Sequence, residues 1–135
     1  MFEQVNELAV LVSAILAVAV GSIWYSPLLF GPLWMKTIGQ EIEAELSKRE
    51  MILASIKSII AQAIFFFVVT QFIQISTTAS ISLATVGGLL LAFLSVSTLS
   101  LAIWEKRPIS YVFVHAGYNA IVIFGGIGII AYWPW

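Results

Sequence analysis

The chain has 135 residues, of which 61% are hydrophobic and 10% charged, and its mean hydropathy is +1.03. Soluble domains carry roughly 25% charged residues, so the composition excludes an ordinary soluble domain. Six bases against seven acids give a net charge of −1, which supplies no positive field to hold nucleic acid. The sequence contains no cysteine, which removes disulfides, thiolate nucleophiles, iron–sulfur clusters and most zinc sites.

Three long stretches of the sequence contain no charged residue. They are the 28 residues between Glu7 and Lys36, the 47 between Lys57 and Glu105, and the 28 that follow Arg107. Because about 20 apolar residues cross a bilayer as a helix, the outer stretches hold one span each and the middle stretch holds two. We therefore predict an all-α, polytopic membrane protein in which four transmembrane helices form a compact bundle.

Breaks in helical sequence separate the four spans. The first span ends where Pro27 and then Pro32 disrupt regular helix, and Pro108 precedes the last span. The small, polar cluster 76–80 is the turn signal inside the middle stretch and predicts a tight helical hairpin. The predicted spans are residues 8–25, 51–75, 81–104 and 109–133, within a single domain of residues 1–135.

The basic residues predict the orientation in the membrane. All six bases flank the loop 36–50 or lie in the loop 105–107, on one side of the predicted bundle. The positive-inside rule places both loops in the cytoplasm and both termini outside the cytoplasm, in the cell membrane. The N-terminal stretch carries Glu3 and Glu7 and no base before Lys36, which argues against a cleaved signal peptide.

Two stripes of small residues predict where helices pack closely, because helix association in lipid depends on close backbone approach. The stripe on the first span is Ala9, Ser13, Ala17 and Gly21, and the stripe on the third span is Ser80, Ala84, Gly88 and Ala92. We expect the first and third spans to form the packed centre. A homo-oligomer contact through one of the stripes is the alternative.

Several polar residues fall at one depth inside the spans. Lys57 and His115 each lie six residues into a span, roughly 9 Å deep, and Thr98 lies at a similar level. Gln62 and Asn119 lie about one turn deeper. The candidate binding layer comprises His115, Lys57, Gln62, Asn119, Tyr25, Trp24, Thr98 and Tyr118.

Helical spacing predicts that two polar edges face each other. Ser58 and Gln62 are four residues apart on the second span, as are His115 and Asn119 on the fourth. Ionisable groups inside membranes usually face the bundle interior, and a neutral imidazole both donates and accepts hydrogen bonds. One hypothesis is that the layer binds or passes a small polar or anionic solute or a proton, as a homo-oligomer, since four helices enclose little volume.

The alternative is that the same residues only hold the helices together. Lys57 can then extend its ammonium to the headgroups, while His115 bonds a carbonyl or Tyr25. The protein is in that case a non-transporting membrane subunit or scaffold that packs against the helices of a partner membrane protein.

Catalytic and cofactor signatures are missing from the sequence. It has no Gly-x-Ser-x-Gly elbow, no Gly-Lys-Ser/Thr phosphate loop and no His-Glu-x-x-His pair. One histidine, no cysteine and no acid within the predicted spans do not supply a metal or haem ligand set. We expect no enzyme activity, no cofactor and no metal.

Two segments resemble a known family. The segment 21–36 (GSIWYSPLLFGPLWMK) resembles the signature of a prokaryotic membrane protein family, domain of unknown function 1761. The residues 104–108 (WEKRP), followed by His115-Ala116-Gly117-Tyr118, resemble its C-terminal half; the chain departs at Asn119, where the family pattern implies Gln or an apolar residue. The resemblance implies a compact four-helix integral membrane protein, and it transfers no activity and no site residue.

Two connecting segments carry expectations of their own. The segment 26–36 is either a bent segment that dips into the cytoplasmic leaflet and closes the polar layer, or a plain interfacial anchor. In the segment 40–50, Ile42 and Leu46 lie four apart among charges, which predicts a short, solvated surface helix leading into the second span.

Overall fold

The computed structural model describes residues 5–39 and 47–134, and all of its regular secondary structure within these residues is helical. The helices are α1 (Glu7–Trp24), α2 (Gly31–Ile38), α3 (Lys48–Ala79), α4 (Leu83–Trp104) and α5 (Ile109–Ala131). Four of them, α1, α3, α4 and α5, are long and apolar enough to cross a membrane. The predicted fold class, an all-α membrane protein with four spans, is confirmed. Most of the surface helix expected in 40–50 lies outside the described residues.

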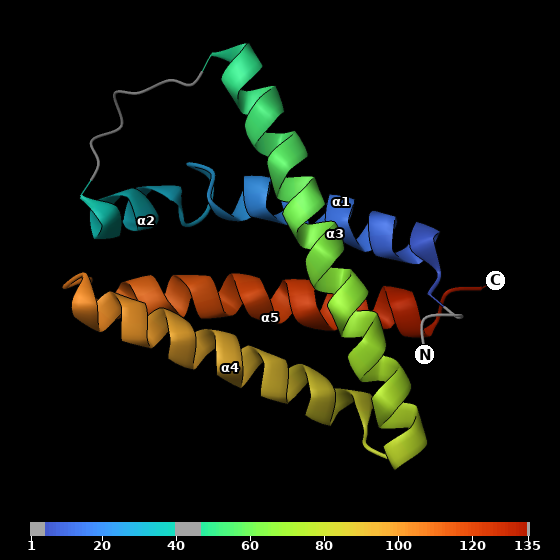
Figure 1. Ribbon diagram of the computed structural model, residues 1–135. Coiled ribbons are helices and arrows are strands. Elements are labelled where there is room, and N and C mark those ends of the chain that lie inside the picture. Colours follow the sequence, from blue (N-terminus) through green and yellow to red (C-terminus); the bar gives the residue numbers. More distant parts are fainter. Residues whose placement is uncertain (1–4, 40–46, 135) are drawn as a thin grey trace.

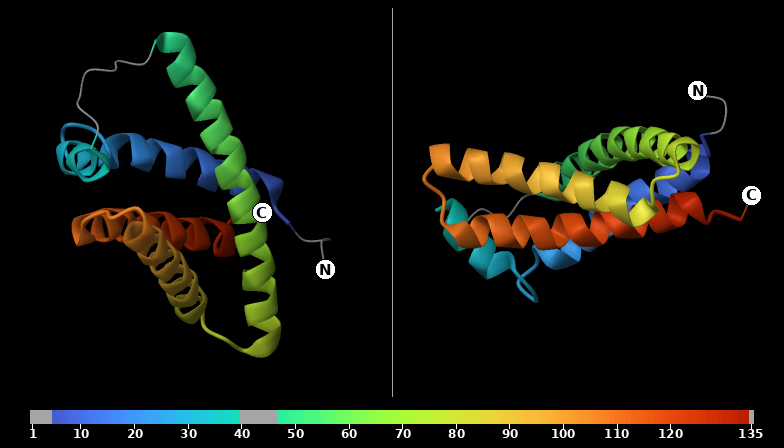
Figure 2. Two further views of the ribbon diagram at one scale, coloured as in Figure 1. Left: turned by 60° about the vertical axis from the view of Figure 1, so that its left-hand side comes forward. Right: turned by 90° about the horizontal axis from the view of Figure 1, so that it is seen from below.

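The helices form a layered arrangement with one steep crossing. Helices α1 and α5 lie side by side and antiparallel, α4 folds back along α5, and α3 crosses α1 and α5 at a steep angle (Figure 1). The left view of Figure 2 shows the same crossing, and the right view, from below, shows α3 on one side of α5. The start of α1 and the end of α5 share one end of the molecule. At the other end α2 lies beside the start of α5; we call it the basic end, because Lys36, Lys106 and Arg107 lie there.

Helix α3 is longer at both ends than the predicted span 51–75. Ser47 caps its N-terminus by accepting a hydrogen bond from a backbone N–H, and the hydroxyls of Ser76 and Thr77 donate to the Ile73 carbonyl at 2.7 and 2.9 Å. These local bonds keep the polar cluster helical until Ser80, whose φ of 56° ends the helix. At 1.5 Å per residue, α3 is about 48 Å long against a hydrocarbon core of about 30 Å, so it needs a tilt to fit.

The buried core joins α1, α5 and the second half of α3. Its members are Val10, Ala14, Ala17, Phe66, Val69, Val122, Ile123 and Ile127. The Phe66 ring occupies the space beside Gly126, where a methyl group would overlap it. The small residues of α1 and this glycine therefore let three helices approach closely, as the stripe on the first span predicts.

The expectation that the third span lies at the packed centre is wrong. Its predicted stripe, Ser80, Ala84, Gly88 and Ala92, is exposed. The face that meets α5 is turned by one residue, since Val86 and Gly87 are buried and Gly87 lies against the Phe124 ring. Adjacent residues on a helix point about 100° apart, so this shift moves the whole stripe away from α5.

Candidate functional site

A compact loop at the end of α1 brings the aromatic segment 24–34 to the basic end. The Phe30 N–H donates to the Trp24 carbonyl at 3.0 Å, and the Gly31 N–H donates to the Ser26 carbonyl at 3.0 Å. A Cβ at Gly31 would lie 2.5 Å from that Ser26 oxygen, so only glycine fits. The loop is therefore compact, and α2 starts close to the end of α1 and continues in the same general direction (Figure 1).

The two aromatic residues that end α1 contact α5. The Trp24 indole N–H donates to the Val114 carbonyl at 3.1 Å, and its ring covers Gly117, where a Cβ would lie 2.8 Å away. The Tyr25 hydroxyl is 2.9 Å from His115 Nδ1. Both side chains thus hold α1 to α5 and place a phenol against the only histidine of the sequence.

The hydrogen bond between Tyr25 and His115 indicates one tautomer. The His115 Nε2 atom is enclosed and has no hydrogen-bond partner among the described residues. If Tyr25 donates to Nδ1, only the Nε2–H stays unpaired. If Nδ1–H donates instead, both the Tyr25 proton and the Nε2 lone pair lack partners. We infer that Tyr25 donates and that His115 carries its proton on Nε2.

Tyr118 ties three helices together one turn further along α5. Its hydroxyl donates to the Ala17 carbonyl of α1 at 3.1 Å and accepts from the Gln62 amide of α3 at 3.4 Å. Its ring also packs against Tyr25, with ring centroids 5.5 Å apart. Helices α1, α3 and α5 are therefore connected at this level through tyrosine hydroxyls.

These side chains border a cavity of about 460 Å³ between α1, the first half of α3 and α5. We call it the His115 cavity; its lining residues are Val18, Gly21, Ser22, Tyr25, Ala54, Ser55, Ser58, Gln62, His115, Tyr118 and Asn119. The residues on α5 are half-buried and form its floor, whereas Ser22, Ser55 and Ser58 are exposed and form its mouth. A pocket of this size is within the usual range for small ligands.

Of the eight predicted site residues, five line the cavity, a sixth packs beside it, and two lie apart from it. Tyr25, Gln62, His115, Tyr118 and Asn119 line the cavity, and Trp24 packs directly behind it.

Lys57 and Thr98 do not line the cavity. Lys57 is exposed, because Ser58 and Gln62 occupy the face of α3 that points toward the cavity and Lys57 is about 100° away from Ser58. Thr98 lies on α4 and donates to the Leu94 carbonyl of its own helix at 2.8 Å. Matching depth was therefore not sufficient to bring these two residues to His115.

Sequence reasoning missed two serines at the mouth of the cavity. The Ser22 hydroxyl donates to the Val18 carbonyl and the Ser55 hydroxyl to the Met51 carbonyl, each at 2.9 Å, which leaves their lone pairs available as acceptors. For Ser55 a signal was available in the sequence. Ser55, Ser58 and Gln62 are spaced at i, i+3 and i+7, which places them on one face of the helix.

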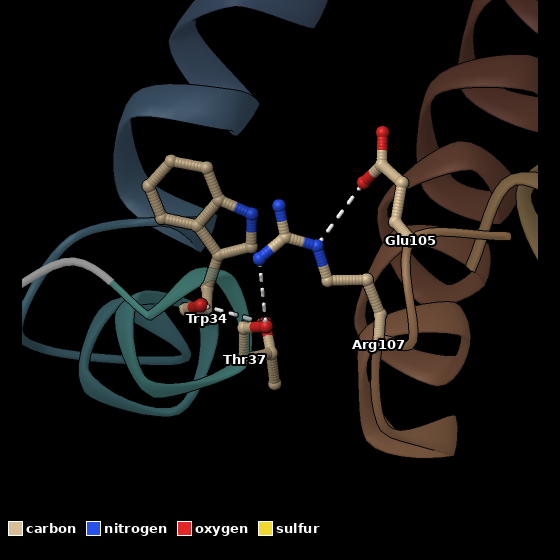
Figure 3. A network of polar contacts seen from close by, with 4 residues as sticks. All are labelled: Trp34, Thr37, Glu105 and Arg107. Carbon is tan, nitrogen blue, oxygen red and sulfur yellow. Dashed lines mark hydrogen bonds and ion pairs between the residues drawn. The ribbon is translucent and has the colours of Figure 1, made fainter. Parts of the chain in front are cut away.

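Helix α2 covers the basic end of the site. The Trp34 ring packs on Tyr25, with centroids 5.3 Å apart. Arg107, in the turn between α4 and α5, donates to the Thr37 carbonyl at 3.3 Å and pairs with Glu105 at 3.1 Å (Figure 3). This chain of contacts connects the α4–α5 turn, through α2, to the Tyr25 phenol that binds His115.

The fold and the cavity together define a small helical membrane protein with a polar cavity between three of its spans. The chain belongs to the family described as "Protein of unknown function (DUF1761)", whose model matches residues 8–131. No curated protein and no solved structure matches the chain. Among residues 5–39 and 47–134, no group of three or more metal-ligating side chains comes together.

Proposed function

We propose that this protein binds a small polar solute within the membrane, in the His115 cavity. One observation carries the proposal. Polar side chains from three apolar helices, each long enough to span a membrane, line a single cavity. Unsatisfied polar groups are costly in hydrocarbon, so a polar cavity there favours occupation by water or a polar ligand.

Binding is better supported than passage through the single chain. Beyond the His115 cavity, the space between α1, α3 and α5 is filled by the core residues Phe66, Val69, Ile123 and Ile127. A solute that crossed the whole membrane along this route would have to displace packed side chains, which is costly. The acids described, Glu7, Glu50 and Glu105, do not line the cavity, which favours a binding role over acid–base catalysis.

The orientation that we propose follows from charge. The basic end carries Lys36, Lys106 and Arg107, so by the positive-inside rule it faces the cytoplasm. Both termini then lie outside the cytoplasm, and a solute enters the His115 cavity from the cytoplasmic leaflet.

The experiment that tests this proposal uses the absence of native cysteine. Ser58→Cys places a thiol at the cavity mouth, and Ser97→Cys is the matched control, because Ser97 is also exposed but lies on α4 away from the cavity. In lipid nanodiscs, a water-soluble thiosulfonate reagent should label Ser58→Cys on the order of tenfold faster, because the reaction needs a hydrated thiolate. Equal and slow labelling of both variants would show a dry cavity and refute the proposal.

The exposed stripe on α4 favours a second candidate function, a scaffold that packs against partner helices or against its own copy. Gly88 has open space around it, and Ser80, Ala84 and Ala92 are exposed. A Gly88→Cys variant that forms a disulfide-linked dimer in the membrane, where an exposed Phe93→Cys variant does not, would support this candidate. Equal cross-linking of both variants would count against it.

A further inference from the structure

A second, smaller cavity adjoins the His115 cavity. It has a volume of about 170 Å³ and lies between α3, α4 and α5. Its lining residues are Ala61, Gln62, Phe65, Leu94, Asn119, Val122 and Ile123. Gln62 and Asn119 line both cavities, so these two amides stand at the boundary between a polar chamber and an apolar one.

The two cavities follow one another in a fixed direction. Along α5 the lining passes from His115 to Asn119 and then to Ile123, and along α3 from Ser58 to Gln62 and then to Phe65. Helix α5 runs inward from the basic end at this level, and α3 crosses it at a steep angle (Figure 1). The polar chamber therefore lies nearer the headgroups and the apolar chamber nearer the bilayer centre, which is the orientation of an amphiphile in a leaflet.

The polar chamber offers hydrogen bonds but no charge. Neither the Asn119 amide nor the Ser58 hydroxyl forms a hydrogen bond within the described residues. The Gln62 amide forms one, which it donates to the Tyr118 hydroxyl at 3.4 Å. Lys57 does not line the chamber, and neither does any described acid. A charged ligand would therefore lose its hydration without gaining a counter-charge, whereas a neutral group that donates and accepts fits the free amides.

The apolar chamber suits one short hydrocarbon chain. An apolar cavity of about 150 Å³ holds a six-carbon ring, so this open cavity of about 170 Å³, with the exposed Ala61 at its mouth, holds about six carbons of a chain and leaves the chain end free to extend outward. We propose that the ligand is an uncharged amphiphile, with a hydrogen-bonding head held by Gln62 and Asn119 and one short chain lying against Phe65 and Leu94. This inference rests on the proposed function: the polar group that occupies the His115 cavity is the head of an amphiphile, and its chain occupies the smaller cavity.

Asparagine side-chain signals provide a direct test. The sequence contains two asparagines, Asn119 in the site and Asn6, which caps α1 far from it. The protein, ¹⁵N-labelled at asparagine side chains and held in nanodiscs, is titrated with 1-monooctanoylglycerol and, separately, with octanoate. We expect a saturable shift of the Asn119 signals with monooctanoylglycerol only, while the Asn6 signals stay in place. An equal response to octanoate would overturn the requirement for a neutral head, and no response to monooctanoylglycerol would overturn the inference as a whole.

The role of the apolar chamber needs its own variants. Ala61→Phe fills that chamber and should raise the half-saturating mole fraction of monooctanoylglycerol at least fivefold, whereas Ala92→Phe, on the exposed side of α4, should leave it unchanged. Leu94→Trp fills the chamber from α4 and serves if Ala61→Phe fails to fold, as judged by the Asn6 signals. Unchanged binding in a folded, filled variant would refute the chain site. Rapid labelling of Ser58→Cys would then still support the proposed function, so the two failures are distinguishable.

Discussion

Tyr25→Phe is the substitution that most clearly separates the hydrogen bond of Tyr25 from its packing. The variant removes one oxygen atom and keeps the ring that contacts Trp34, His115 and Tyr118. His115 Nδ1 then loses its 2.9 Å partner, while Nε2 already has none among the described residues. Hydrogen bonds between membrane helices contribute about 0.6 kcal/mol on average and up to about 1.7 kcal/mol. We expect the free energy of unfolding to fall by about 1 kcal/mol, because the loss of this bond leaves the imidazole without a hydrogen-bond partner.

Two measurements check this prediction: a ¹⁵N-histidine spectrum and the midpoint of denaturant unfolding. Because His115 is the only histidine, a ¹⁵N-histidine spectrum reports its ring nitrogens without overlap. The original protein should show a protonated Nε2 and an accepting Nδ1, and Tyr25→Phe should show exchange between the two tautomers. Tyr132→Phe is the matched control, because Tyr132 is 82% exposed, and it should change neither the spectrum nor the unfolding midpoint. An unchanged histidine spectrum in Tyr25→Phe would refute the assigned bond.

Two further predictions concern packing and the cover of the site. Gly126→Ala should destabilise the fold by about 1–3 kcal/mol in denaturant unfolding, because the added methyl overlaps the Phe66 ring, whereas Gly88→Ala, with open space around it, should have little effect. A Gly126→Ala protein as stable as Gly88→Ala would contradict the packing described. Arg107→Gln should make the amides of α2 exchange hydrogen about fivefold faster, because the contact to the Thr37 carbonyl is lost, and should leave exchange in α1 unchanged. Equal α2 exchange in both proteins would mean that Arg107 does not hold this helix.

The positions of the membrane spans could be read from the sequence because charge is excluded from hydrocarbon. The predicted first and last spans, 8–25 and 109–133, agree with α1 and α5 to within two residues at each end. Helix α3 continues past the predicted end of the second span, where Ser76 and Thr77 were interpreted as a turn. Their hydroxyls instead bond to carbonyls of their own helix, an option that composition alone does not reveal.

The sequence gives the position of each polar residue along its helix but not the direction in which its side chain points. Residue counting places Lys57, Thr98 and His115 at one level, yet the rotation of each helix decides which side chains meet. That rotation is set by packing, such as the fit of Phe124 beside Gly87 rather than Gly88. The predicted residues that do line the cavity include pairs on one helix face. Ser58 and Gln62 lie four residues apart on α3, so together they indicate which face of that helix points toward the cavity.

The most direct test of the central claim is a structure of the protein in lipid nanodiscs, resolved well enough to show ordered molecules in the His115 cavity. We expect non-protein density about 3 Å from the Asn119 amide, with Tyr25 bonded to His115 Nδ1. A closed site, in which the first half of α3 packs against α5 and Asn119 bonds to Ser58 or Gln62, would contradict ligand binding in this cavity.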